Sequence, residues 1–178
     1  MDEVEKYGFF STSDLEKSAE ILQLFKNFGL ILGTAESLTG GLLSAAFTSI
    51  PGASHAFTGG LTVYQTYQKH DILGVPEDLL QQYGPASEQC AYAMAKRTLN
   101  TFSCDGAIST TGVAGPDKDE WGRAVGTVFV SCAFGSECKV KELHLDSALT
   151  RHEIRMLTVK ESLSFSLSFF QSCVGPLS

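Results

Sequence analysis

Apolar residues recur at helical spacing in three long segments of the chain. The first begins at Ser13, where Glu16 three residues later completes a capping-box pattern, and it ends at Gly29. The second follows Ser87, a good N-cap residue, and the third begins near Arg151. The spacing therefore predicts long helices over 13–28, 88–102 and 151–170 and short ones over 42–50 and 76–83, with residues 65–70 leading into a further short helix.

Short apolar and β-branched runs between glycine-rich turns indicate the strands. The run 125–134 is mostly apolar and has no charged residue, which is typical of a buried strand. The run 139–145 alternates polar and apolar residues, which suits the edge of a sheet. The segment Phe57–Gly60 ends in two glycines and is interpreted as a turn. Strands are therefore predicted at 30–35, 61–64, 107–110, 125–134 and 139–145.

The order of these elements predicts an α/β fold in which helices sandwich a mixed β-sheet. With 178 residues, of which 43% are hydrophobic and 19% charged, the chain can bury one sizeable core. No internal repeat or low-complexity segment divides it. We therefore expect a single domain over residues 13–178, preceded by a flexible lead-in over residues 1–12.

Charge and cysteine content narrow the range of partners and locations. A formal net charge of -7 argues against non-specific binding to nucleic acid or to an anionic membrane, although one local pocket can still be positive. No apolar run approaches the roughly 20 residues needed to span a bilayer. The segment Met1–Lys6 is acidic where a secretory signal would be basic. The five cysteines form no C-x-x-C pair, so we expect reduced thiols and a cytoplasmic protein.

One polar turn between a strand and a helix is well suited to chemistry. Glu36, Ser37 and Thr39 place three oxygen-bearing side chains within four residues, and Gly40 and Gly41 follow them. A helix start offers free backbone N–H groups and a partial positive charge to an anion, and glycines let a ligand approach the main chain. The alternative is that the serine or the threonine merely caps the helix.

A second glycine-rich turn, Thr111-Gly112-Val113-Ala114-Gly115-Pro116-Asp117, follows another predicted strand. Ligands bind at the carboxyl ends of strands in open α/β sheets, so the two turns would frame one pocket if their strands are neighbours. Neither turn matches a Walker A loop, G-x-G-x-x-G or G-x-S-x-G. Standard triphosphate and dinucleotide sites are therefore excluded at the level of motifs.

A nucleophilic hydroxyl such as that of Ser37 needs a base. None of the four histidines lies in a catalytic motif, and no metal-ligand spacing is present. A lysine with a lowered pKa, helped by a tyrosine, is the other option, and Tyr64 and Lys69 lie just after a strand. Spacing alone favours the plainer alternative of a surface lysine and a core tyrosine. Arg151 and Arg155 share a helix face and could hold a phosphate or simply be solvated.

A set of motifs runs in order along most of the chain: Thr34–Gly41, Pro51–Ser54, Phe57–Gly60, Val63-Tyr64, Lys69, Leu73–Val75, Gly84–Glu88, Thr111–Asp117 and Val125–Val128. This ordered set resembles the CinA C-terminal domain family, the nicotinamide mononucleotide deamidases also called PncC. The resemblance covers roughly residues 14–170 and, given the length of the chain, implies the stand-alone form without the amino-terminal domain of full-length CinA proteins.

The resemblance implies an amidohydrolase that converts nicotinamide mononucleotide and water to nicotinic acid mononucleotide and ammonia, without a metal or other cofactor. It makes Ser37 the nucleophile, Tyr64 and Lys69 its assistants and Arg151 a substrate-binding arginine. It also implies a homodimer or larger homo-oligomer, for which Phe165, Phe169 and Phe170 could form the interface, or else they fill the core. The expected substrate-binding residues are Glu36, Thr39, Gly40, Gly41, Thr111, Gly112, Ala114, Gly115 and Arg151, with either glycine turn serving the oxyanion or the phosphate.

Three segments depart from the family pattern. Gln65-Thr66 replaces the usual Ser-Asn, Lys118–Ala124 replaces a Gly-Gly loop that ends in proline, and Ala148–Thr150 replaces a Gly-Asp before the arginine. These changes keep open a second hypothesis, a nucleotide-binding module that has lost turnover. A third, a competence- or damage-associated scaffold, rests on the family's label, and the acidic charge gives no support for DNA contact.

Overall fold

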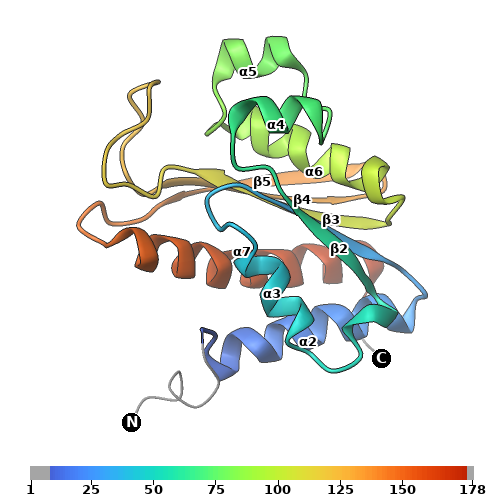
Figure 1. Ribbon diagram of the computed structural model, residues 1–178. Coiled ribbons are helices and arrows are strands. Elements are labelled where there is room, and N and C mark those ends of the chain that lie inside the picture. Colours follow the sequence, from blue (N-terminus) through green and yellow to red (C-terminus); the bar gives the residue numbers. More distant parts are fainter. Residues whose placement is uncertain (1–8, 176–178) are drawn as a thin grey trace.

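The computed structural model describes residues 9–175, which form a five-stranded sheet with helices on both faces (Figure 1). The strand order is β2-β1-β3-β4-β5. The first three of these strands are parallel, and β4 and β5 are antiparallel, so the predicted mixed sheet is confirmed, with β5 at an edge. The strands are β1 (Leu32–Glu36), β2 (Phe57–Thr62), β3 (Gly106–Gly112), β4 (Thr127–Phe134) and β5 (Glu137–His144).

The helices form two layers, with α2, α3 and α7 on one face of the sheet and α4, α5 and α6 on the other (Figure 1). Each layer encloses an apolar core, the larger of which includes Phe25, Phe47 and Phe170. Among residues 9–175, no helix is both long and apolar enough to cross a bilayer. The helices are α2 (Thr12–Asn27), α3 (Leu42–Thr48), α4 (Thr66–Asp71), α5 (Glu77–Tyr83), α6 (Glu88–Phe102) and α7 (Arg151–Val174), with a 3₁₀ turn at Ala53–His55.

The start of the first described helix differs from the prediction. Ser11, not Ser13, is the N-cap of α2, and its capping-box partner is Asp14, not Glu16. Phe10 is buried in the core just before this cap, so ordered packing begins before the end of the predicted lead-in. Residues 1–8 of that lead-in lie outside the described part of the chain, and the division into lead-in and domain stays a prediction.

The interpretation of Phe57–Gly60 as a turn is wrong, because these residues form most of β2 and pair with β1. The glycine at position 60 serves close packing rather than chain reversal. A Cβ there would lie 2.1 Å from Ser44 Oγ of α3 and 2.3 Å from Thr34 Oγ1. This contact between elements far apart in sequence has no local pattern that would reveal it.

The phenylalanines of the last helix fill the core. Phe170 is fully buried and meets Phe25 edge to face with ring centroids 4.8 Å apart, and Phe169 is also buried. Phe165 is only partly buried against the same core. Of the two alternatives for these side chains, core packing is therefore the one observed for Phe169 and Phe170, and the homo-oligomer stays a prediction.

Candidate functional site

The two polar turns meet at the carboxyl end of the parallel strands, as predicted. β1 and β3 are neighbours in register, with Glu36 opposite Thr110. A cavity of about 280 Å³ opens beyond these strand ends. Its lining includes Ser37 from the first turn, Lys69 from α4, Arg151 from α7 and the whole segment Thr111–Gly115. Residues spread over 115 positions of the sequence, between Ser37 and Arg151, thus converge on one site.

Ser37 and Lys69 are in direct contact within this cavity. Lys69 Nζ lies 3.0 Å from Ser37 Oγ, 2.9 Å from the carbonyl oxygen of Val63 and 3.3 Å from that of Tyr64. The lysine side chain is 1% exposed. Burial away from water disfavours the charged ammonium and lowers the pKa of Lys69 below its ordinary value of 10.5. A neutral amine at this position can accept the serine proton.

The alternative of a surface lysine and a core tyrosine, which spacing alone favours, is wrong for both residues. Lys69 is buried, and Tyr64 is 50% exposed at the mouth of the cavity. The short helix α4 follows β2 after Tyr64 and Gln65 and turns Lys69 inward beneath the strand ends. Tyr64 remains in the connection, where its hydroxyl faces Arg151.

Arg151 bridges the rim of the cavity. Its guanidinium donates to the Tyr64 hydroxyl at 2.6 Å and to the carbonyl oxygen of Gly115 at 2.7 Å. Arg155 does not join it as a second cavity cation, because its Nε donates to Leu38 O and its Nη2 to Thr39 O, both at 2.9 Å. The expectation of an arginine pair on one ligand is therefore wrong for Arg155.

The carboxylate of Glu36 occupies the start of α3. It accepts hydrogen bonds from the backbone N–H groups of Gly41, Leu43 and Ser44 at 2.8–3.1 Å and from the Ser44 hydroxyl at 2.5 Å. Glu36 is fully buried. The helix start is thus already neutralised by an internal anion, which corrects both the expectation of free N–H groups there and the alternative of a Ser37 or Thr39 cap.

The remaining residues of the first turn also lie outside the cavity lining. Thr39 is fully buried, and its hydroxyl is hydrogen-bonded to that of Thr110 at 2.7 Å. The N–H of Gly40 donates to the carbonyl oxygen of Ser37 at 3.1 Å, and a Cβ at Gly40 would lie 3.2 Å from Nη2 of Arg155. Glu36, Thr39, Gly40 and Gly41 therefore belong to the turn that presents Ser37, and they are not among the residues that line this cavity.

Replacing Glu36 with glutamine is expected to lower the free energy of unfolding by about 1–3 kcal/mol, because the amide loses the charge and one acceptor oxygen while three backbone N–H groups, that of Leu43 buried and those of Gly41 and Ser44 partly buried, still need acceptors. Urea unfolding measures the change as a lower midpoint with an unchanged slope. Glu20→Gln, on the exposed face of α2, is the control and should shift stability by less than about 0.5 kcal/mol. Equal midpoints for the two variants would contradict the capping role.

The second turn supplies most of the cavity wall. Thr111 is buried and donates its hydroxyl to the carbonyl oxygen of Pro85 at 2.6 Å. Gly112 has φ 155°, and a Cβ there would lie 2.6 Å from the carbonyl oxygen of Thr127. Within residues 9–175, the N–H groups of Ala114 and Gly115 have no hydrogen-bond acceptor. The second turn, unlike the first, has open donors beside the cavity.

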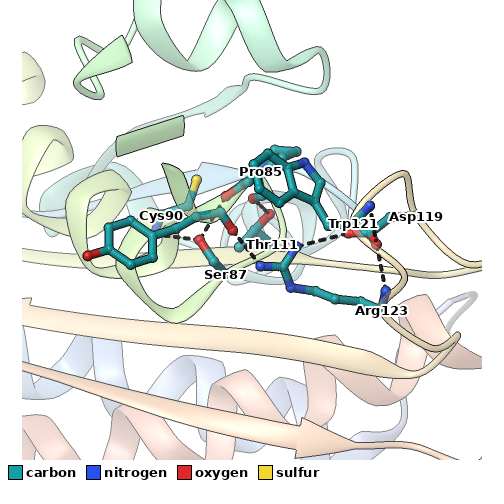
Figure 2. Close-up of polar contacts among 9 residues, drawn as sticks. Pro85, Ser87, Cys90, Thr111, Asp119, Trp121 and Arg123 are labelled. Carbon is teal, nitrogen blue, oxygen red and sulfur yellow. Dashed lines mark hydrogen bonds and ion pairs between the residues drawn. The ribbon is translucent and has the colours of Figure 1, made fainter. Parts of the chain in front are cut away.

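The segment Lys118–Ala124, which departs from the family pattern, lines a second cavity beside the first. Figure 2 shows the polar contacts that Asp119, Trp121 and Arg123 of this segment make. Trp121 lies over Gly84, where a Cβ would come within 2.8 Å of the indole ring. Arg123 holds the loop by an ion pair with Asp119 at 3.2 Å and a hydrogen bond to the carbonyl oxygen of Tyr83. The second cavity, of about 740 Å³, shares Thr66, Pro85 and Asp119 with the first.

Several lining residues had no clear signal in the sequence. Pro85 and Ala86 belong to a motif that the resemblance contains, but no side-chain chemistry singled them out. Leu38 and Asp119 also line the cavity, although neither was predicted as a site residue. Among the described residues, no three His, Cys, Asp or Glu side chains gather closely enough to hold a metal ion. All five cysteines are free thiols.

The sequence of the chain is similar to those of known proteins. A family model described as the CinA C-terminal domain matches residues 14–170. The chain belongs to the CinA C-terminal domain family. It is 40% identical over 154 residues to a putative competence-damage inducible protein of Halalkalibacterium halodurans, which covers 86% of this chain and 36% of that protein. It is 39% identical over 155 residues to a CinA-like protein of Synechococcus sp., covering 87% of this chain and 37% of that protein.

Solved structures of CinA relatives share the whole fold. The competence/damage inducible protein CihA from Agrobacterium tumefaciens superposes with a TM-score of 0.86 at 32% identity, covering 91% of this chain and 98% of that one. A CinA superfamily protein from Escherichia coli gives 0.84 at 26% identity, covering 90% and 93%. The chain thus spans little more than a third of the curated relatives above but nearly all of these two crystallised proteins.

Proposed function

We propose that this CinA-family chain is an amidohydrolase that converts nicotinamide mononucleotide and water to nicotinic acid mononucleotide and ammonia, in the recycling of pyridine nucleotides in the cytoplasm. One observation carries the proposal. The amine of Lys69 is buried, has a lowered pKa and lies 3.0 Å from the Ser37 hydroxyl, inside a cavity with an arginine at its rim. The resemblance to the nicotinamide mononucleotide deamidases supplies the substrate.

The proposed reaction uses the serine as a nucleophile and the lysine as its base. Ser37 Oγ attacks the carboxamide carbon, and its proton passes to Lys69 Nζ. The tetrahedral intermediate collapses when the C–N bond breaks, and the lysine returns the proton to the departing ammonia. Water then attacks the ester carbon and gives a proton to Lys69. The bond between that carbon and Ser37 Oγ breaks, Lys69 returns the proton to Ser37 Oγ, and nicotinic acid mononucleotide leaves. No step requires a group that the chain does not supply.

The rim of the cavity suits the nucleotide end of this substrate. Arg151 is exposed and keeps guanidinium N–H groups beyond those that contact Tyr64 and Gly115, so it can receive a phosphate. The hydroxyl of Tyr64 accepts a hydrogen bond from the same arginine and lines the same cavity as Ser37, so it can donate to the substrate or to the leaving group. The pyridine ring would then enter between Leu38 and the second turn.

Ammonia release from nicotinamide mononucleotide by the purified chain tests this function. We expect multiple turnover that saturates with substrate, because a preformed serine–lysine pair needs no further component. Calorimetric titration of the same nucleotide separates this result from the binding-module hypothesis that the segments Gln65-Thr66 and Lys118–Ala124 raise. Saturable binding with no ammonia above the protein-free blank would contradict the amidohydrolase proposal and favour a binding module.

A further inference from the structure

We propose that the backbone N–H of Leu38 binds the negatively charged oxygen of the tetrahedral intermediate, and that Arg155 is the positioning residue that orients and polarises this donor. The inference rests on the proposed function, since it assigns a further part of the same reaction. It adds a residue of α7 that lies outside the cavity lining.

The proposed donor is the backbone N–H of Leu38, which lies beside the cavity. Leu38 is buried, lines the cavity and directly follows the nucleophile. Within residues 9–175, no acceptor is hydrogen-bonded to its N–H. Buried backbone N–H groups are nearly always paired with protein, water or a ligand. An N–H next to the nucleophile is well placed for the oxygen of a carbonyl that the nucleophile attacks.

Arg155 acts on this donor through a chain of hydrogen bonds. Its Nη2 donates to the carbonyl oxygen of Thr39, and the N–H of that same peptide unit, on Gly40, donates to the carbonyl oxygen of Ser37. The peptide unit of that last carbonyl carries the N–H of Leu38. Each bond strengthens the dipole of the next peptide, so the arginine's positive charge is passed along two peptide units to the N–H beside the cavity.

The guanidinium also fixes the turn sterically. Its second bond, from Nε to the carbonyl oxygen of Leu38, holds the two successive carbonyls of the turn on the side of α7. Glu36 anchors the other end of the turn through the N–H of Gly41. The planar fork of arginine can meet two carbonyls at once, whereas the point charge of lysine cannot match both positions. Arg155→Lys therefore tests orientation while the charge is retained.

The inference can be tested without relying on the natural substrate. An alkyl fluorophosphonate reacts with an activated serine when Ser37 Oγ forms a bond to phosphorus, fluoride leaves, and the serine proton passes to Lys69. The phosphoryl oxygen draws on the same donors as the oxyanion. The labelling rate constant and the probe's half-saturating concentration are measured by intact-protein mass spectrometry for the wild type, Arg155→Met, Arg155→Lys and Arg97→Lys. Arg97 is an exposed residue of α6 outside both cavities and serves as the control.

We expect Arg155→Met to lower the maximal labelling rate by about 10- to 100-fold, with less than about a threefold change in the half-saturating concentration, because the donor acts mainly in the transition state. Arg155→Lys should fall between this variant and the wild type, and ethylguanidinium should restore part of the Arg155→Met rate. If Arg155→Met does not fold, the labelling rate of Arg155→Lys relative to the wild type still tests the inference. Unchanged rates in the folded variants would overturn the inference.

The outcomes separate this inference from the proposed function. If Ser37 is labelled, the Arg155 variants are slow, and nicotinamide mononucleotide yields no ammonia, then the substrate is wrong and the role of Arg155 stands. If ammonia is released but labelling is equally fast in all four proteins, the function stands and the inference fails. If Ser37 of the wild type is never labelled, the nucleophile and the inference fail together.

Discussion

Ser37→Ala is expected to reduce ammonia release from nicotinamide mononucleotide by at least about 10³-fold, because within residues 9–175 the hydroxyl of Ser37 is the only one hydrogen-bonded to Lys69 Nζ. Substrate affinity should change by less than about threefold, since the removed oxygen bonds the lysine rather than the nucleotide. Steady-state kinetics and calorimetric titration measure the two quantities. Ser136→Ala, at the exposed β4–β5 turn, is the matched control and should keep full activity.

A Ser37→Ala protein that keeps a tenth or more of the wild-type rate would remove the serine from the mechanism. The cavity would then be left with a buried lysine as a base for direct attack by water. A loss of both turnover and binding would instead indicate that the turn had collapsed, which the melting curve of the variant would reveal. The predicted pattern is a stable protein that binds and does not turn over.

Lys69→Met is expected to lower turnover by about 10²- to 10⁴-fold, because the serine loses the group that takes its proton. Methionine keeps most of the lysine's volume but offers no donor to the carbonyl oxygens of Val63 and Tyr64. Lys160→Met, on the exposed face of α7, should be neutral. Activity of Lys69→Met within threefold of the control would contradict the assignment of the base.

The lowered pKa of Lys69 gives two pH signatures in the wild type. Turnover should rise as the pH increases through this pKa, because only the neutral amine accepts a proton. Between that pKa and the ordinary 10.5, the unfolded chain holds a proton that the folded chain does not, so the free energy of unfolding rises with pH across this range. Below the folded pKa both states hold the proton, and this contribution stays at its lower level. Urea titrations of Lys69→Met should lack this component, and an identical pH dependence would contradict it.

Local sequence signals explain how much of the fold was predictable. α6 begins and ends at the predicted residues because Ser87 caps it with its own side chain and Ser103 adopts a left-handed φ of 49° at its end. The first four residues of β2 were interpreted as a turn because Gly59-Gly60 has the composition of a turn, whereas Leu61 and Thr62 lie within the predicted strand 61–64. The real requirement at Gly60 is the close approach of Ser44 from α3, which depends on packing between separate elements.

The sequence predicted the site residues that follow neighbouring strands in recognisable motifs. It did not predict which of the polar side chains are buried or what they contact. Ser37 and the turn Thr111–Gly115 follow neighbouring strands, and the sheet brings them together as expected. Lys69 lies in a six-residue helix among polar neighbours, so only its position beneath the strand ends shows that it is buried. Glu36 carries a carboxylate suited to a ligand, yet the three-dimensional position of α3 makes it a helix cap.

The central claim is that Ser37 becomes covalently attached to the substrate during turnover. Acid quenching of the wild type during turnover of nicotinamide mononucleotide, followed by mass spectrometry of the peptide that contains Ser37, tests it most directly, with hydroxylamine added in parallel to divert the ester. The account predicts an adduct on Ser37 equal in mass to the substrate less ammonia, and a hydroxamate of nicotinic acid mononucleotide with hydroxylamine. Ammonia release with neither the adduct nor the hydroxamate would contradict it.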